Sequence, residues 1–128
     1  MPEPVAIAER AARAGAEVLA RWAGRVNARE KGPADLVTQA DVESQETIQS
    51  ILLEAFPGHK FWGEEGSQVP SLDGYVWVVD PLDGTTNFVH GVPQYCVSVG
   101  LLRDGTPVAG CIYDPSLDES FTAALGHG

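Results

Sequence analysis

The chain has 128 residues, of which 44% are hydrophobic and 20% are charged, a balance typical of one globular domain that can bury a core. Eighteen acidic residues against eight Lys and Arg give a formal net charge of −10, which argues against nucleic acid or an anionic membrane surface as the main partner. No apolar run reaches the roughly 18 residues of a membrane span, and the N-terminus lacks a secretory signal, so we expect a cytoplasmic protein.

The N-terminal part of the chain is predicted to form one amphipathic helix followed by an irregular segment. Apolar residues recur at helical spacing over residues 5–23, and Gly15 on the apolar face suggests close packing. The polar stretch 27–41 is interrupted by Gly32 and Pro33, which favours a loop or a mobile hairpin.

A second helix is predicted to begin near Asp41. Its first turn is acidic, as the helix dipole prefers, and its apolar residues again recur at helical spacing. It should stop at Phe56, because Pro57 and Gly58 cannot continue a helix.

The rest of the chain is predicted to form a mostly antiparallel sheet. Residues 59–67 read as a short strand that runs into a turn, and residues 75–79, apolar at nearly every position, as a strand buried on both faces. Two apolar runs flank residues 103–106, where Asp-Gly is a strong hairpin signal, and a further strand is predicted at 120–124. Two helices followed by such a sheet indicate the α+β class, with the two helices packed on the sheet.

The two cysteines, Cys96 and Cys111, each lie in an apolar, strand-like setting without a CxxC pattern or neighbouring histidines. We therefore expect two buried, reduced thiols. A disulfide between them is the alternative, and the spacing gives no support to a zinc site.

Two aspartates three residues apart, Asp80 and Asp83, follow the predicted buried strand directly. Two full negative charges 4 Å apart repel by about 4 kcal/mol at an effective dielectric of 20, so we expect a bound cation to hold them together. Pro81 favours an extended backbone at Asp80, which places that carboxylate at the end of the strand before the chain turns, with Asp83 folding back to the same side. Residues 84–87 are predicted to form the first turn of a short helix, whose free N–H groups suit a phosphate.

Carboxylate oxygens without nearby histidine or cysteine favour Mg²⁺ over zinc. A two-metal site for phosphoryl transfer needs further carboxylates, and Glu64, Glu65 and Asp41 are the candidates. The alternative is structural, because a lone Asp-x-x-Asp before glycine is usually a turn and a lone Glu-Glu pair is usually solvated surface. It is the combination that favours a functional site.

The stretch 77–88, WVVDPLDGTTNF, resembles the Asp-Pro-x-Asp-Gly-Thr signature of the inositol monophosphatase family of Mg²⁺-dependent, often lithium-sensitive phosphatases. GEEG and KGPADLVTQAD resemble the family's two upstream motifs in the same order, and YDPSLDESFTAALGHG resembles the segment after its central hairpin. The resemblance covers nearly the whole chain. It implies that residues 1–128 form the metal- and phosphate-binding N-terminal half of a layered αβαβα sandwich whose C-terminal domain is absent from this chain.

The resemblance also implies a set of metal ligands. Glu64, Asp80 and the backbone carbonyl of Leu82 would bind one Mg²⁺, and Asp80 would bridge to a second ion held by Asp83. A complete site would hold two or three ions, with Mn²⁺ as a possible substitute.

Further residues acquire roles from the same resemblance. Thr85 would orient and help to deprotonate the attacking water, with Asp41 as its hydrogen-bond partner and Glu64 as a catalytic ligand. Glu65 would orient a water molecule behind the ligands, and Lys31 would lie on a loop that covers the site or be a solvated loop lysine. The substrate would contact Glu64, Leu82, Asp83, Gly84 and Thr85.

The implied reaction is in-line attack of a metal-activated water on a small phosphate monoester, without a covalent nucleophile. The substrate could be inositol 1-phosphate, histidinol phosphate, a sugar bisphosphate or an adenosine bisphosphate. The resemblance further implies a homodimer.

The chain departs from the family in its length, because family members are considerably longer. Their second half carries a Trp-Asp-x-Ala motif whose aspartate completes the second metal site, and no segment here matches it. We therefore expect a truncated or proteolytic fragment, or a natural short form, with sheet surface exposed. The alternative function is a non-catalytic module that binds metal and phosphate or serves assembly. A calcium loop of an extracellular module fits poorly, since EF-hand spacing and a secretion signal are absent.

Overall fold

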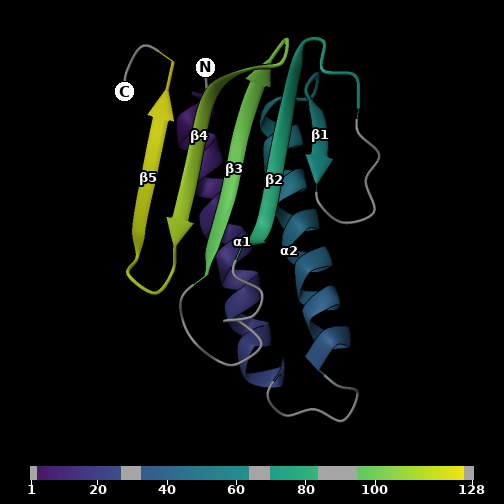
Figure 1. Cartoon of the computed structure of the whole chain (residues 1–128), viewed down its shortest axis with the longest axis vertical. Helices are drawn as coiled ribbons and strands as arrows, with labels where there is room; N and C mark the ends of the chain where they lie inside the picture. Colours follow the sequence, from purple (N-terminus) through teal and green to yellow (C-terminus); the bar gives the residue numbers. More distant parts are fainter. Residues whose placement is uncertain (1–2, 27–32, 64–69, 84–94, 126–128) are drawn as a thin grey trace.

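The computed structural model describes residues 3–26, 33–63, 70–83 and 95–125, without the side chains of residues 23–26, 33–38 and 81–83. Within these ranges, two helices cover one face of a five-stranded sheet (Figure 1). The elements are α1 (Pro4–Val26), α2 (Pro33–Ala55), β1 (Lys60–Gly63), β2 (Tyr75–Asp83), β3 (Cys96–Arg103), β4 (Thr106–Asp114) and β5 (Glu119–Ala124). The predicted α+β class is confirmed. Neither helix is long and apolar enough over its described residues to cross a membrane.

The strands lie across the sheet in chain order, β1-β2-β3-β4-β5. β1 pairs in parallel with β2, with Gly63 level with Val79, whereas the other three pairs are antiparallel. The sheet is therefore mostly antiparallel, as predicted. The one parallel pair within the described part of the sheet brings the carboxyl ends of β1 and β2 to the same edge (Figure 1).

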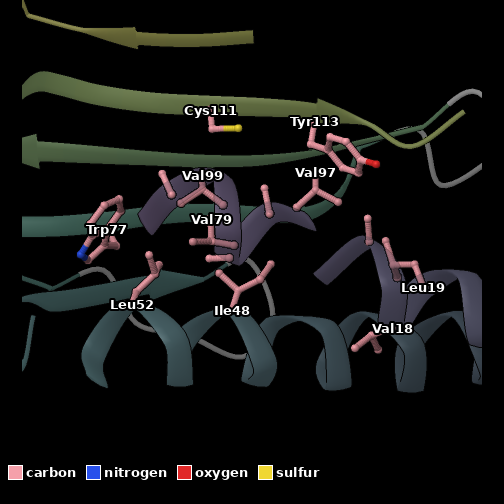
Figure 2. Close-up of a cluster of buried hydrophobic side chains, with 14 of the residues drawn as sticks. Val18, Leu19, Ile48, Leu52, Trp77, Val79, Val97, Val99, Cys111 and Tyr113 are labelled. Atoms are coloured by element: carbon pink, nitrogen blue, oxygen red, sulfur yellow. The ribbon is translucent and has the colours of Figure 1, made fainter. Parts of the chain in front are cut away.

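The hydrophobic core lies between the helices and the sheet. Alternate residues of the central strands face the helices, and the larger side chains of the helices pack against them (Figure 2). Fully burying one such side chain contributes about 1.5 to 3 kcal/mol to stability. The largest fully buried side chains are those of Trp77, Leu19, Ile48, Leu52, Leu101, Val18, Val76, Val97 and Val99.

The first predicted helix is confirmed, but the second begins earlier than predicted. α2 starts at Pro33, so residues 33–40 are helical and the prediction of a loop or hairpin over residues 27–41 is wrong for them. Proline suits the first turn of a helix, because its missing N–H has no partner there and its φ is already helical. The remainder of that stretch, residues 27–32, lies outside the described residues. The helix ends at Ala55, one residue before the predicted end, in front of Pro57.

The strand predictions hold with one extension. β1 and β5 lie at the predicted positions, and the turn between β3 and β4 has positive φ at Asp104 (51°) and Gly105 (82°), as a tight Asp-Gly hairpin requires. Val76 and Trp77, on opposite faces of β2, are both fully buried, but Val78 is half-buried and Tyr75 is exposed, so the prediction of a strand buried on both faces holds only for the middle of the strand. β2 extends four residues beyond the predicted 75–79 to end at Asp83.

Both cysteines are free thiols, as predicted. Cys111 is buried in the core, and burial raises the pKa of its thiol to about 11. Cys96 is only half-buried, so the expectation that both side chains are buried holds fully for Cys111 alone.

An exposed cluster joins α1 to the turn between β4 and β5. The Arg13 guanidinium donates hydrogen bonds to Asp118 Oδ1 (2.9 Å) and Ser120 Oγ (3.3 Å), and it lies over the Tyr113 ring at 4.7 Å. Tyr113 Oη also donates to Asp118 Oδ1 (2.8 Å). These hydrogen bonds, from Tyr113 and then Arg13, lower the pKa of Asp118. Because Arg13 and Asp118 are solvent-exposed, their ion pair adds little stability.

The two helices pack closely at Gly15, as predicted. A Cβ at Gly15 would lie 2.6 Å from Ile48 Cδ1 and 2.9 Å from Ser44 Oγ, and Ser44 Oγ donates a hydrogen bond to the Gly15 carbonyl (2.9 Å). Both neighbouring side chains are fully buried, so neither has room to move.

We therefore predict that Gly15→Ala forces the helices apart and lowers the free energy of unfolding in urea by about 1 to 3 kcal/mol. Gly58→Ala is the matched control, because a Cβ at Gly58 meets nothing within 4 Å; it should change stability by less than about 0.5 kcal/mol. Equal effects of the two substitutions would contradict close helix packing at Gly15.

A second prediction concerns His59, which lies between α2 and β1. Trp77 Nε1 donates a hydrogen bond to His59 Nδ1 (3.0 Å), and the imidazole stacks on Phe56 (4.7 Å between centroids) and Tyr75 (4.6 Å). The hydrogen bond requires an unprotonated Nδ1, so the folded state favours neutral His59. Burial lowers the pKa of His59 below its ordinary value of 6.5.

A lowered pKa in the folded state means that the stability from His59 is complete above about pH 6.5 and is lost as the pH falls through the folded pKa. Urea unfolding between pH 7.5 and 5 should therefore show declining stability. His59→Phe keeps the ring stacking and has no titrating group, so its stability should be lower at pH 7.5 and should depend less on pH. Parallel pH curves for the two proteins would rule out a neutral His59 in the fold.

Candidate metal and phosphate site

Only part of the predicted site falls within the described residues, and the end of β2 carries most of that part. Asp41 and Asp80 are described with their side chains, and Leu82 and Asp83 with their backbone only. The remaining predicted site residues lie outside the described residues, namely Lys31, Glu64, Glu65, Gly84 and Thr85.

The end of β2 contains an irregularity between the two aspartates. Asp80 is level with Ser98 and Asp83 is level with Cys96. Two residues of β2 therefore lie between these pairs, opposite one residue of β3. The predicted turn after Asp80 is therefore wrong, because both aspartates lie within β2. The extra residue makes a β-bulge, where Pro81 is tolerated because one strand residue need not donate to the ladder.

The bulge has a direct consequence for the two aspartates. In a regular strand, residues three apart belong to opposite faces of the sheet. Ser98 and Cys96 are two residues apart and share a face, so their register partners Asp80 and Asp83 also occupy positions on one face. Since Val97, Val99 and Leu101 of β3 are buried against the helices, this is the face turned away from them.

The ends of β1 and β2 lie side by side. Gly63, the last residue of β1, is level with Val79, and the next residues along the two chains are Glu64 and Asp80. Asp80 is half-buried. The parallel register therefore puts the residue before Glu64 level with the residue before Asp80.

Asp41 lies in the N-terminal half of α2. This helix runs opposite to β1 and β2, so its N-terminal half lies toward the edge where these strands end (Figure 1). The Asp41 side chain is only 8% exposed, which is unusual for a helix aspartate, because burying a carboxylate is costly unless other groups compensate. The fold therefore keeps an acidic side chain buried on α2.

The described donors are oxygens, which is the chemistry that Mg²⁺ prefers. They are the Asp80 carboxylate and the backbone carbonyl of Leu82, both at the bulge. Within residues 3–26, 33–63, 70–83 and 95–125 there is no group of three or more acidic, histidine or cysteine side chains arranged around one metal position. A complete ligand set therefore requires Glu64 or the Asp83 side chain, and the donors present fit Mg²⁺ in type.

Sequence reasoning missed Gln45, one turn after Asp41 on α2. Its side-chain amide lies against Gly63 at the end of β1. The spacing of four residues from Asp41 is the only signal that could have indicated it, because residues i and i+4 share a helix face.

Comparisons with known proteins show similarity over most or all of the chain. The model of the inositol monophosphatase family matches residues 1–128. The inositol-1-monophosphatase of Rhizobium meliloti (strain 1021) is 48% identical over 99 residues, covering 77% of this chain and 37% of that protein. The fructose-1,6-bisphosphatase/inositol-1-monophosphatase of Aquifex aeolicus is 41% identical over 125 residues, covering 95% of this chain and 47% of that protein.

A solved structure of an inositol monophosphatase has a similar fold. The structure of inositol monophosphatase from Anabaena (Nostoc) sp. PCC 7120 superimposes with a TM-score of 0.81 at 39% sequence identity, over 97% of this chain and 44% of that one. The chain thus spans less than half the length of these relatives.

Proposed function

Because the chain belongs to the inositol monophosphatase family, we propose that it carries the metal- and phosphate-binding half of a Mg²⁺-dependent phosphatase for small phosphate monoesters. The observation that carries the proposal is the β2 bulge. It gives Asp80 and Asp83 positions on one face of the sheet, and Asp80 follows Val79, which is level with Gly63 at the end of β1. Carboxylates gathered in this way repel each other unless cations offset their charge.

In this proposal the chain holds the metal through oxygen atoms alone. Glu64, Asp80, the Leu82 carbonyl and Asp83 would be the ligands, with Asp80 shared between two ions. When bound, Mg²⁺ lowers the pKa of the attacking water and offsets the negative charge that develops on the leaving oxygen. Two or three ions would complete the site, and Mn²⁺ would substitute.

The remaining residues position the water and the phosphate. The Thr85 hydroxyl would accept a hydrogen bond from the attacking water and donate its own hydrogen to the buried Asp41 carboxylate, which favours loss of a proton from the water. The N–H groups of Gly84 and Thr85 would donate to phosphate oxygens. Glu65 would orient a further water molecule. No serine or cysteine is needed as a nucleophile.

The substrate we propose is inositol 1-phosphate, because similar proteins are named for inositol monophosphate. The Aquifex aeolicus relative is also named for fructose 1,6-bisphosphate. Histidinol phosphate and adenosine bisphosphates belong to the same chemical class. The active form would be a homodimer.

A second function is favoured by one observation, the length of the relatives. The matched parts cover only 37% to 47% of the curated relatives described above. If residues of the other part are needed for turnover, the chain would act as a module that binds metal and phosphate without hydrolysis.

We predict that Asp80→Asn and Thr85→Ala each lower Mg²⁺-dependent phosphate release from inositol 1-phosphate by about 100-fold or more, since each removes a group that acts on the reacting atoms. Asp73→Asn is the matched control, because Asp73 is an exposed residue before the opposite end of β2. Its activity should equal that of the unchanged protein. The measurement is phosphate release at saturating Mg²⁺.

Calorimetric titration with Mg²⁺ and Mn²⁺ separates the two functions. Metal binding that depends on Asp80, without phosphate release, would favour the binding module. Flat titration curves with both ions would contradict both functions.

A further inference from the structure

Gly63, the last residue of β1, is buried beneath the side chain of Gln45. A Cβ built on Gly63 would lie 2.5 Å from both Nε2 and Oε1 of the Gln45 amide, and still closer to the amide carbon. Real Cβ atoms do not approach other atoms to such distances. The amide of Gln45 therefore occupies the space that any side chain at residue 63 would need.

The backbone conformation does not explain the glycine. Gly74 and Gly105 have positive φ, where glycine is favoured, but Gly63 lies in a strand and does not share that conformation. Glycine inside a strand weakens it, and it often marks a place where another group approaches the backbone closely. Here the approaching group is the Gln45 amide, so the glycine and the glutamine form one contact.

This contact lies at the predicted site. Gln45 is one helical turn after Asp41 on α2, and Gly63 is the residue immediately before Glu64. The amide offers two hydrogen-bond donors and one acceptor at the point where β1 leaves the sheet. It therefore lies between the element that carries Asp41 and the strand that leads to Glu64.

We propose that Gln45 is a positioning residue, which fixes the end of β1 and thereby the position of Glu64 relative to Asp80 and the metal. The inference rests on the function proposed above, because it requires Glu64 to be a metal ligand. Gln45 itself does not touch the metal or the substrate. A role in packing alone would change stability and leave metal affinity unchanged.

The first test compares two glutamines of the same helix. Gln45→Ala should weaken Mg²⁺ binding, measured by calorimetric titration, by about 10-fold, the lower range for residues that orient metal ligands. Gln49→Ala makes the same chemical change one turn later on α2, away from Gly63, and should leave the affinity within about two-fold of the unchanged protein. Equal affinities for the two variants would overturn the proposal.

The second test uses the contact itself. Gly63→Ala should push the amide aside and weaken Mg²⁺ binding by about 10-fold, with little change in the thermal unfolding midpoint, because the Gln45 side chain is flexible at its end. In the Gln45→Ala background the new methyl group has room. Gly63→Ala should therefore cause no further loss of affinity there.

Losses that multiply independently in the double variant would show that the two residues do not act through one contact, and would overturn the inference. Circular dichroism of the same samples measures the fraction of unfolded protein. A loss of affinity that this fraction fully accounts for would also overturn the inference. If the unchanged protein binds no Mg²⁺, or binds it equally after Asp80→Asn, the proposed function fails first and the role of Gln45 fails with it.

Discussion

The parallel pairing of β1 with β2 is the constraint on which the rest of the arrangement depends. Every other strand pair in the described sheet is antiparallel, and antiparallel neighbours end at opposite edges. Only a parallel pair brings two carboxyl ends together, and here these ends precede Glu64 and carry Asp80. The pair is held by the core beneath it, where Trp77 and Val79 of β2 pack against the helices. An acidic site at this edge is therefore supported by a strand anchored in the core.

The bulge in β2 is a second constraint, because it allows an arrangement of Asp80 and Asp83 that a regular strand does not. With strict alternation, Asp80 and Asp83 would lie on opposite faces of the sheet, and no single ion could reach both carboxylates. One extra residue in β2 relative to β3 changes this register, and Pro81 lies within that irregular part of the strand. The bulge therefore gives the two aspartates positions on one face of the sheet, which the proposed metal site requires.

α2 joins the core to this edge. Ile48 and Leu52 are fully buried against the sheet, and Ser44 contacts the backbone of α1 at Gly15. The same helix also carries the buried Asp41, and its Gln45 amide lies against Gly63 at the end of β1. A single rigid helix therefore links the packing of the two layers to the position of the acidic edge. The match over residues 1–128 establishes membership of the inositol monophosphatase family, and the function we propose for this edge builds on it.

The sequence by itself determined the features that depend on neighbouring residues. The periodicity of α1, the Asp104-Gly105 turn and the end of α2 before Pro57 follow from local backbone preferences, and the Asp-Pro-Leu-Asp-Gly-Thr-Thr motif indicated the candidate site residues. Tertiary structure decided the rest. Pro33 is compatible with both a loop and a helix start, the bulge at Pro81 depends on the register of β3, and the Gln45–Gly63 contact depends on how α2 packs against β1. Such features depend on which distant surfaces meet, and no local preference encodes that meeting.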